Sequence, residues 1–400
     1  MVGLGLYLRS AGEVVRVLCA TGGWRGISHQ PVSKVTVKPD FFGVNVAGSA
    51  VDGVNAYVMD RLGDLGVRHV RMDFSYTDPT SFQADLLREL VAQNYRVMVR
   101  LVQPVEQARR MPSASALVHW QEFLMAFANM FDLDGLEAIE VGAVPNRKKW
   151  SGYTHAGYLA AWSMAKEVLQ SGALAGPNVS DFEPLHTIVL LQEMNRRKIR
   201  PDIHTTNLFV ERVREPEAFD HRVLGKRCAD YLKLNLVKKA GVFADLGVRY
   251  GVSRTVCTHT CWNAIRLKRW SEDVERVRAA YLERYLVLAA ASGHLERVYW
   301  GPLIGHGDGL IDDGSGAIDP TERVGHYAFS PGCPDGYKVL PAFERYREVI
   351  ENLSNATFVT GDADPTGPFE FVFEREGQTI TACWERDGLD AGEGIIWRKR

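Results

Sequence analysis

Short apolar segments alternate with amphipathic patterns along most of the chain. In the amphipathic stretches, for example 81–93, 116–131 and 274–292, apolar residues recur at spacings of three and four residues, as one buried helix face requires. The apolar segments predict strands at 41–45, 69–74, 96–102, 138–142, 173–177, 202–209, 254–259 and 298–303. Such a succession of strand–helix units predicts a parallel (β/α)8 TIM barrel, an α/β fold. A doubly wound open sheet is the alternative, but no glycine-rich phosphate-binding turn follows the first strand.

The pattern changes after the helix expected at 341–352. The segments "ATFVTG", "FEFVFERE" and "TITACWER" alternate apolar and polar residues, and Glu376 and Gly377 separate the last two. This pattern predicts a small antiparallel β appendage, which "KVTVKP" at 34–39 could join. We therefore expect a (β/α)8 barrel at 33–354 and an appendage packed on it at 355–400, while 1–32 shows no clear pattern.

Composition narrows the class of protein. The chain has 400 residues, of which 46% are hydrophobic and 24% charged, as in a globular protein with a large core. A net charge of −2 gives no reason to expect a nucleic-acid partner. No apolar run approaches the roughly 18 residues of a membrane span. Charged residues interrupt the apolar piece at 14–20, and the six cysteines are scattered, so we expect reduced thiols and a cytoplasmic location.

In a (β/α)8 barrel the functional side chains gather at the carboxyl ends of the strands. Polar and aromatic residues at these ends, or in the loops that follow, are therefore candidate ligand contacts. They are Arg71, Asp73, Asn146, Arg147, Trp150, Asn207, His259, Trp262 and Trp300. An aromatic face such as that of Trp300 can pack on the apolar C–H face of a pyranose.

The order of these strand ends carries a resemblance. The stretches "RMDFSY", "EVGAVPNRKKWSGY", "GPNVSDFEP", "NLFVER", "CTHTCW" and "SGHLERVYWGPLIGHGDGLIDD" follow one another from about Phe41 to Asn352. This region resembles the retaining glycoside hydrolases of clan A, nearest the xylosidase and iduronidase type. It is also similar to bacterial glycosidase-like proteins of surface-polysaccharide gene clusters. The resemblance implies a carbohydrate partner, an oligosaccharide or polysaccharide, and no cofactor.

The departures from the family pattern concern its chemistry. Retaining enzymes use two carboxylates about 5 Å apart, an acid/base and a nucleophile. In the family the acid/base follows an Asn at the end of strand four, where this chain has Ala143 and Val144. The nucleophile follows a Thr on strand seven, where this chain has His259. A His and Tyr pair on strand six appears here as Asn207 and Phe209.

These replacements predict a carbohydrate-binding protein with a degenerate active site and no standard retaining hydrolysis. Two alternatives remain open. The first is an active glycosidase with relocated chemistry that uses Glu183, Glu211 or His259. The second is a protein-interaction scaffold that does not bind sugar. A filled or apolar cavity at the carboxyl ends of the barrel strands would favour this alternative.

The candidate residues also have structural interpretations. Glu183 could open a helix capped by Ser180 or Asp181, and Glu211 could pair with a neighbouring arginine. Arg71 and Arg100 could form buried pairs with Asp73 or Glu140 rather than make the mouth positive. Trp300 could be a core residue.

A metal site is not expected. Cys257, His259 and Cys261 alternate along one predicted strand, but no second cysteine pair completes a four-ligand zinc site. The stretch "GHGDGLIDDG" at 305–314 lacks the ligand spacing of an EF-hand loop.

Overall fold

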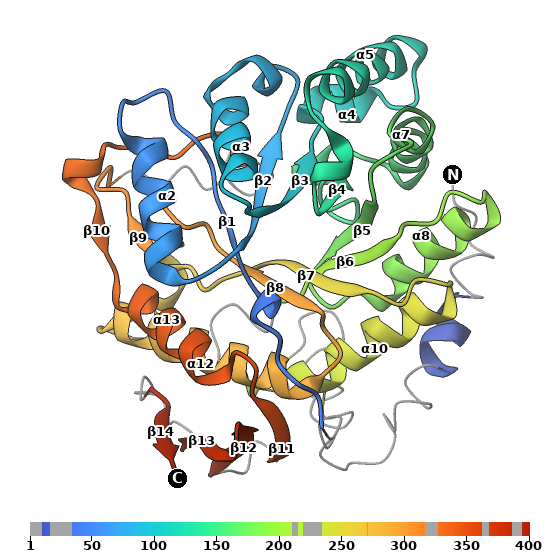
Figure 1. Cartoon of the computed structure of the whole chain (residues 1–400). Coiled ribbons are helices and arrows are strands. Elements are labelled where there is room, and N and C mark those ends of the chain that lie inside the picture. Colours follow the sequence, from blue (N-terminus) through green and yellow to red (C-terminus); the bar gives the residue numbers. More distant parts are fainter. Residues whose placement is uncertain are drawn as a thin grey trace.

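The chain folds into a closed barrel of eight parallel strands, surrounded by helices (Figure 1). This computed structural model describes residues 10–16, 34–209, 215–218, 234–269, 271–316, 327–361, 368–385 and 394–400. The barrel strands are β1 (Phe42–Asn45), β2 (His69–Phe74), β3 (Arg96–Leu101), β4 (Ala138–Val141), β5 (Leu174–Ser180), β6 (Ile203–Asn207), β7 (Thr255–Thr260) and β8 (Arg297–Trp300). Because β1 pairs with both β2 and β8, the barrel closes, and the predicted (β/α)8 fold is confirmed.

The helices cover the outside of the barrel and pack their apolar residues against the strands. They are α2 (Val54–Leu65), α3 (Phe82–Ala92), α4 (Val105–Arg110), α5 (Ala114–Met130), α6 (Lys148–Ser151), α7 (His155–Val168), α8 (Pro184–Arg196), α10 (Leu236–Arg249), α11 (Ala264–Leu267), α12 (Val274–Ser292) and α13 (Pro341–Leu353). The main core therefore lies between the strands and this helical layer. No helix in the described part of the chain combines the length and apolar character that a membrane-spanning helix requires.

The interior of the barrel has an apolar end and a polar end. A small cluster separate from the main core fills the amino-terminal half, and its members are Met98, Ala138, Ala175, Ile203, Val256 and Tyr299. Gly43 makes room for this filling, because a Cβ there would lie 2.6 Å from the Tyr299 ring. Two residues further along β3, β4 and β7, the interior positions are polar, because Arg100, Glu140 and Thr258 occupy them. The barrel thus has a packed floor, and polar chemistry gathers at its carboxyl-terminal mouth.

The largest differences from the sequence prediction are at the carboxyl ends of two strands. The sequence predicts that the fifth strand ends at Pro177, but β5 continues to Ser180. A register shift between Pro177 and Val179 places the extra residue, Asn178, at a φ of 50°, so a bulge allows pairing to resume. The eighth strand was expected to reach Leu303, but it ends at Trp300, before a cis Gly301–Pro302 bond.

The C-terminal appendage is a four-stranded antiparallel sheet. Its strands are β11 (Thr357–Gly361), β12 (Phe369–Arg375), β13 (Gln378–Trp384) and β14 (Ile396–Lys399). Figure 1 shows it beyond α12 and α13, on the outside of the helical layer. As expected, the segment before the barrel joins it, since Thr36 forms an antiparallel bridge with Thr357. A second small sheet, β9 (Ile311–Asp312) with β10 (Lys338–Val339), lies in the connection after β8.

Within the N-terminal region, which had no clear pattern, residues 10–16 are helical. Glu13 of this helix forms an ion pair with Arg249, the last residue of α10. This contact places the helix on the outside of the barrel.

Candidate functional site

A buried ionic network fills the centre of the barrel below its mouth. Arg71 donates from Nε to a Glu140 carboxylate oxygen over 3.0 Å and from Nη1 to Asn45 Oδ1 over 2.8 Å. On the other side of Glu140, Thr258 donates its hydroxyl to the second carboxylate oxygen over 3.0 Å. The side chain of Asn207 lies 3.2 Å from the Thr258 hydroxyl. Side chains from five strands are therefore joined in one network.

A second buried arginine, Arg100 of β3, also pairs with a carboxylate. Arg100 donates from Nε to Asp73 over 2.8 Å, and Asp73 also lies 3.4 Å from Arg71. Arg71, Arg100, Asp73 and Glu140 are all buried. The two guanidinium charges are compensated by the two carboxylate charges, in agreement with the structural interpretation of these residues. The positive field that two unpaired arginines would give the mouth is therefore absent from this part of it.

Val144, where the sequence resemblance leads us to expect an acid/base, lies in a small buried apolar cluster. Its other members are Val102, which follows β3, and Ala143, and the partly exposed Trp150 of α6 packs against the cluster. Val144 has a φ of 30°, which is unusual for a β-branched residue and costs on the order of 1–3 kcal/mol. The turn after β4 is therefore strained and carries buried apolar side chains.

The rest of the strand-four loop forms a polar rim. The Asn146 side chain exchanges two hydrogen bonds with the backbone of Ser180, at 2.9 and 3.0 Å, and so joins the β4 loop to the end of β5. Arg147 lies 2.5 Å from both Asp181 and Glu183. Asn146 thus makes structural contacts, whereas the side chains of Arg147 and Asp181 are 25% and 26% exposed at the mouth.

Glu183 belongs to this rim and lies just before α8. The expectation that Ser180 or Asp181 caps this helix is wrong, because Ser180 is the last residue of β5 and α8 begins at Pro184. The Glu183 carboxylate instead contacts Arg147 and lies 3.3 Å from His186. Burial lowers the pKa of His186, and the adjacent Glu183 charge raises it in part. Glu211, the other candidate carboxylate, lies outside the described residues.

His259, where the sequence resemblance leads us to expect a nucleophile, has close partners. Its Nε2 atom lies 3.1 Å from the Gly301 carbonyl oxygen and 2.8 Å from the Tyr327 hydroxyl. The imidazole ring also makes edge-to-face contacts with Phe209 and Tyr327, at ring distances of 5.3 and 5.6 Å. Tyr327 was not foreseen from the sequence, because it lies in an aperiodic segment rich in Gly and Pro that carries no strand or helix signal.

Two of the three tryptophans expected to contact a sugar, Trp262 and Trp300, lie below the surface. Trp300 is 3% exposed and stacks on Trp262 with ring centres 5.8 Å apart. Tyr285 of α12 packs edge-on against Trp300. This corrects the expectation of an open aromatic face at Trp300: its ring points outward from the barrel, into the layer between β8 and α12. A contact of either tryptophan with sugar remains a prediction.

Cys257, His259 and Cys261, all of which the structure describes, do not form a group of metal-ligating atoms. Cys257 lies 3.6 Å from the Tyr285 hydroxyl of α12, whereas His259 Nε2 contacts the Gly301 carbonyl and the Tyr327 hydroxyl. Burial raises the pKa of the Cys257 thiol to about 11, so it is protonated at neutral pH. A metal ion or a nucleophilic thiolate has no support here.

Among the described residues, one group of metal-ligating atoms does come together. Ligand atoms of His306, Asp312 and Asp313 lie within 4.8 Å of one another. Their carboxylates already accept hydrogen bonds from the backbone amides of His306, Gly314 and Ser315. These bonds explain the turn without an ion.

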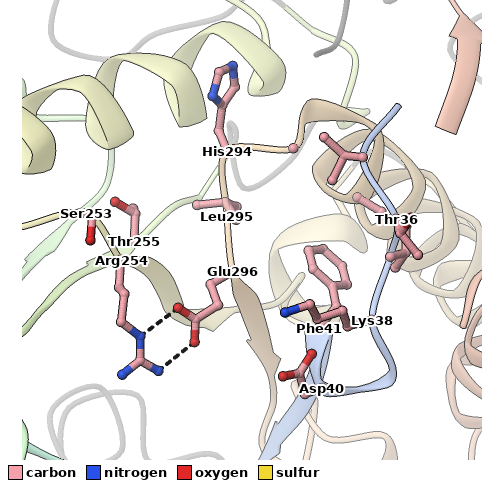
Figure 2. Close-up of a pocket in the computed structure, with 14 residues that line it drawn as sticks. Thr36, Lys38, Asp40, Phe41, Ser253, Arg254, Thr255, His294, Leu295 and Glu296 are labelled. Carbon is pink, nitrogen blue, oxygen red and sulfur yellow. Dashed lines mark hydrogen bonds and ion pairs between the residues drawn. The ribbon is translucent and has the colours of Figure 1, made fainter. Parts of the chain in front are cut away.

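A cavity of about 470 Å³ lies at the other end of the barrel, next to the amino-terminal ends of β1, β7 and β8 (Figure 2). Figure 2 shows Arg254 and Glu296 facing each other across two hydrogen bonds, of 2.7 and 2.6 Å. Arg254 also bonds Glu137 over 3.0 Å. Because these charges pair with one another and this end of a barrel usually serves stability, we regard the cavity as a gap in the scaffold.

No family model matches the sequence, and a search of curated proteins finds no match. Solved structures do share the fold. A family 39 glycoside hydrolase from the gut symbiont Bacteroides cellulosilyticus WH2 aligns with a TM-score of 0.62 and 13% identity, over 89% of this chain and 73% of that chain. A GH30 endoxylanase from Clostridium papyrosolvens C71 aligns with a TM-score of 0.54 and 10% identity, over 88% and 83% of the two chains. Identities this low show a shared fold alone, and this chain shares its eight-stranded barrel with these glycoside hydrolases.

Proposed function

We propose that this chain is a carbohydrate-binding protein that keeps the glycosidase fold but lacks the standard retaining pair of carboxylates. The observation that carries the proposal is the apolar cluster around Val144, at the place where the acid/base would lie. Glu140 on the same strand does not replace it, because its carboxylate is buried and bound by Arg71 and Thr258. His259 cannot form the glycosyl ester through which retaining enzymes pass.

The chemistry of the mouth supports a sugar as the partner. A pyranose has apolar C–H faces and a rim of hydroxyl groups. Trp150, which is partly exposed and packs against the buried apolar cluster, offers a surface for such a face. Tyr327 and His259 offer ring edges and polar atoms on the β7 side. Arg147 and Asp181 can exchange hydrogen bonds with hydroxyl groups at the rim.

We place this binding in bacterial surface-glycan metabolism, and we expect it in the cytoplasm. The first part rests on the sequence resemblance to glycosidase-like proteins of surface-polysaccharide gene clusters. The second rests on the scattered cysteines and the interrupted N-terminal apolar piece.

The test is an array of bacterial capsular and O-antigen polysaccharides, followed by calorimetry on the glycans that bind. Arg147→Met should weaken binding by about 1.5–3 kcal/mol, the usual value of hydrogen bonds to a charged group. Arg88→Met is the matched control, since Arg88 is an exposed arginine of α3 that also pairs with a carboxylate, Asp85. Absence of binding to every glycan would refute the proposal.

One observation favours a second candidate, an enzyme with relocated chemistry. Asp181 and Glu183 both bind the guanidinium of Arg147, so two carboxylates lie close together at the mouth. We expect no turnover of 4-nitrophenyl β-D-xylopyranoside by the wild type. Its leaving group needs little help from an acid, so this substrate tests the nucleophile most directly. Turnover that survives His259→Ala but is lost in Glu183→Gln would establish the second candidate instead.

A further inference from the structure

Residues 327–330, here called the mouth strap, cross the carboxyl-terminal side of the barrel and are held at both ends. At one end the Tyr327 amide donates to Asp73 over 2.8 Å, and its carbonyl accepts from Gln83 over 3.3 Å. At the other end the amide and hydroxyl of Ser330 donate to the carbonyls of Gly48 and Ala47, each over 2.7 Å. The strap therefore joins the loop after β1, the end of β2 and the start of α3.

The Tyr327 side chain ties the strap to β7 as well. Its hydroxyl lies 2.8 Å from His259 Nε2. Burial raises the pKa of Tyr327 well above its ordinary value, so the phenol stays neutral. The strap is thus fixed to the position where a retaining glycosidase carries its nucleophile.

Between these two fixed points, Phe329 is 57% exposed. Among the large hydrophobic side chains exposed in the described part of the chain it is the one aromatic residue. Single exposed apolar residues are ordinary on protein surfaces. This ring differs from the others because the backbone on both sides of it is held by hydrogen bonds at the mouth, so little entropy is lost when a partner settles on it.

We propose that Phe329 is a stacking platform for a pyranose ring of the bound glycan, and that Tyr327 and Ser330 position it. This inference rests on the proposed carbohydrate binding and adds the place and the kind of sugar. One exposed ring matches the area of one sugar face, whereas a protein partner needs a contiguous interface of several hundred Å². The sugar should present an unbroken C–H face, as pyranoses with only equatorial substituents do.

The experiment uses xylohexaose and cellohexaose, two β-linked chains of such pyranoses, together with the glycans that bind on the polysaccharide array. Affinities of the full chain are measured by calorimetry for wild type, Phe329→Ala and Phe329→Tyr. Ile396→Ala is the matched control, because Ile396 is 58% exposed but lies on the C-terminal sheet. Loss of aromatic stacking should weaken binding about tenfold in Phe329→Ala. Phe329→Tyr and Ile396→Ala should bind like the wild type.

A direct readout comes from Phe329→Trp labelled with 5-fluorotryptophan. This variant gains one fluorine resonance, which should shift when the bound sugar covers the ring. A wild type that binds glycans with affinity unchanged in Phe329→Ala, and with no shift of the new resonance, would overturn this inference and leave the proposed function standing. A wild type that binds none of the probes or array glycans would overturn both.

Discussion

At the residue scale, the charges in the barrel centre compensate one another inside the protein. Arg71 and Glu140 are buried, so neither charge gains the hydration that it has in the unfolded chain. A buried ion pair of this kind contributes little net stability, but removal of one member leaves an uncompensated buried charge. The network should therefore be sensitive to single changes and more tolerant of paired ones.

We predict that Arg71→Leu lowers the free energy of unfolding by about 3–5 kcal/mol. Arg71→Leu/Glu140→Leu should recover a large part of this loss, because it removes both charges and fills the space with apolar atoms. Urea unfolding of the two variants and the wild type measures the difference. If the double variant is less stable than Arg71→Leu by the full cost of a second independent substitution, the two side chains do not act as a pair.

The sequence located the strand ends of the site but not the state of its side chains. Val144 and His259 were placed correctly at the ends of strands four and seven, since strand order alone fixes them. The burial of Trp300 depends on its contacts with Trp262 and Tyr285, which no local pattern encodes. Tyr327 reaches His259 from a segment without periodicity, so only the tertiary structure reveals it.

At the scale of elements, turns whose backbone needs a positive φ are where residue type decides the structure. The β12–β13 hairpin closes through Glu376 and Gly377, with φ values of 52° and 80°. Two consecutive positive φ values match a type I′ turn, whose twist suits the two strands that it joins. The alternation of apolar and polar residues and this dipeptide were enough to predict the hairpin. The bulge in β5 was missed, because a proline normally ends a strand and the bulge depends on pairing with β6.

We predict that Gly377→Ala destabilises the protein by about 1–2 kcal/mol, the cost of a left-handed conformation for a residue with a Cβ. Steric contact adds nothing, since a Cβ at Gly377 would meet no atom within 4 Å. Gly336→Ala is the matched control, because that glycine also has open space around it and is absent from the residues with positive φ. Equal effects of the two substitutions in thermal unfolding would show that the turn conformation is not the cause.

At the scale of the whole molecule, two buried carboxyl groups lie where the appendage meets the barrel. Glu217 accepts a hydrogen bond from the Trp384 indole of β13. Glu283 of α12 accepts from the backbone amide of Ile395 over 2.9 Å, and Arg345 of α13 lies 3.5 Å away. Burial raises the pKa of both carboxyl groups to about 7, although Arg284 opposes the shift at Glu217, and the Ile395 amide and Arg345 oppose it at Glu283.

The sign of the resulting pH dependence follows from the protons bound in each state. Between an ordinary pKa of 4.5 and the raised value of about 7, the folded protein keeps a proton that the unfolded chain has lost. The stability that these carboxyl groups contribute is therefore complete below about pH 4.5 and is lost as the pH rises to about 7. Buried histidines act in the opposite direction. Burial lowers the pKa of His69, His155 and His204 to about 4, so their contribution is complete above pH 6.5 and is lost as the pH falls.

Because the two effects overlap, the wild-type profile alone cannot separate them, and the prediction concerns a difference. We predict that Glu283→Gln becomes steadily more stable relative to the wild type as the pH is raised from 5 to 7.5. The amide carries no charge at any pH, so the variant avoids the cost of ionising position 283, while its histidines titrate as before. Urea unfolding at intervals across this range gives the difference directly. Glu344→Gln, which removes a carboxylate that is 53% exposed on α13, controls for a charge change away from the junction.

A constant difference between Glu283→Gln and wild type from pH 5 to 7.5 would mean that Glu283 is ionised throughout. The junction between barrel and appendage would then be held by an ion pair with Arg345 rather than by a protonated acid.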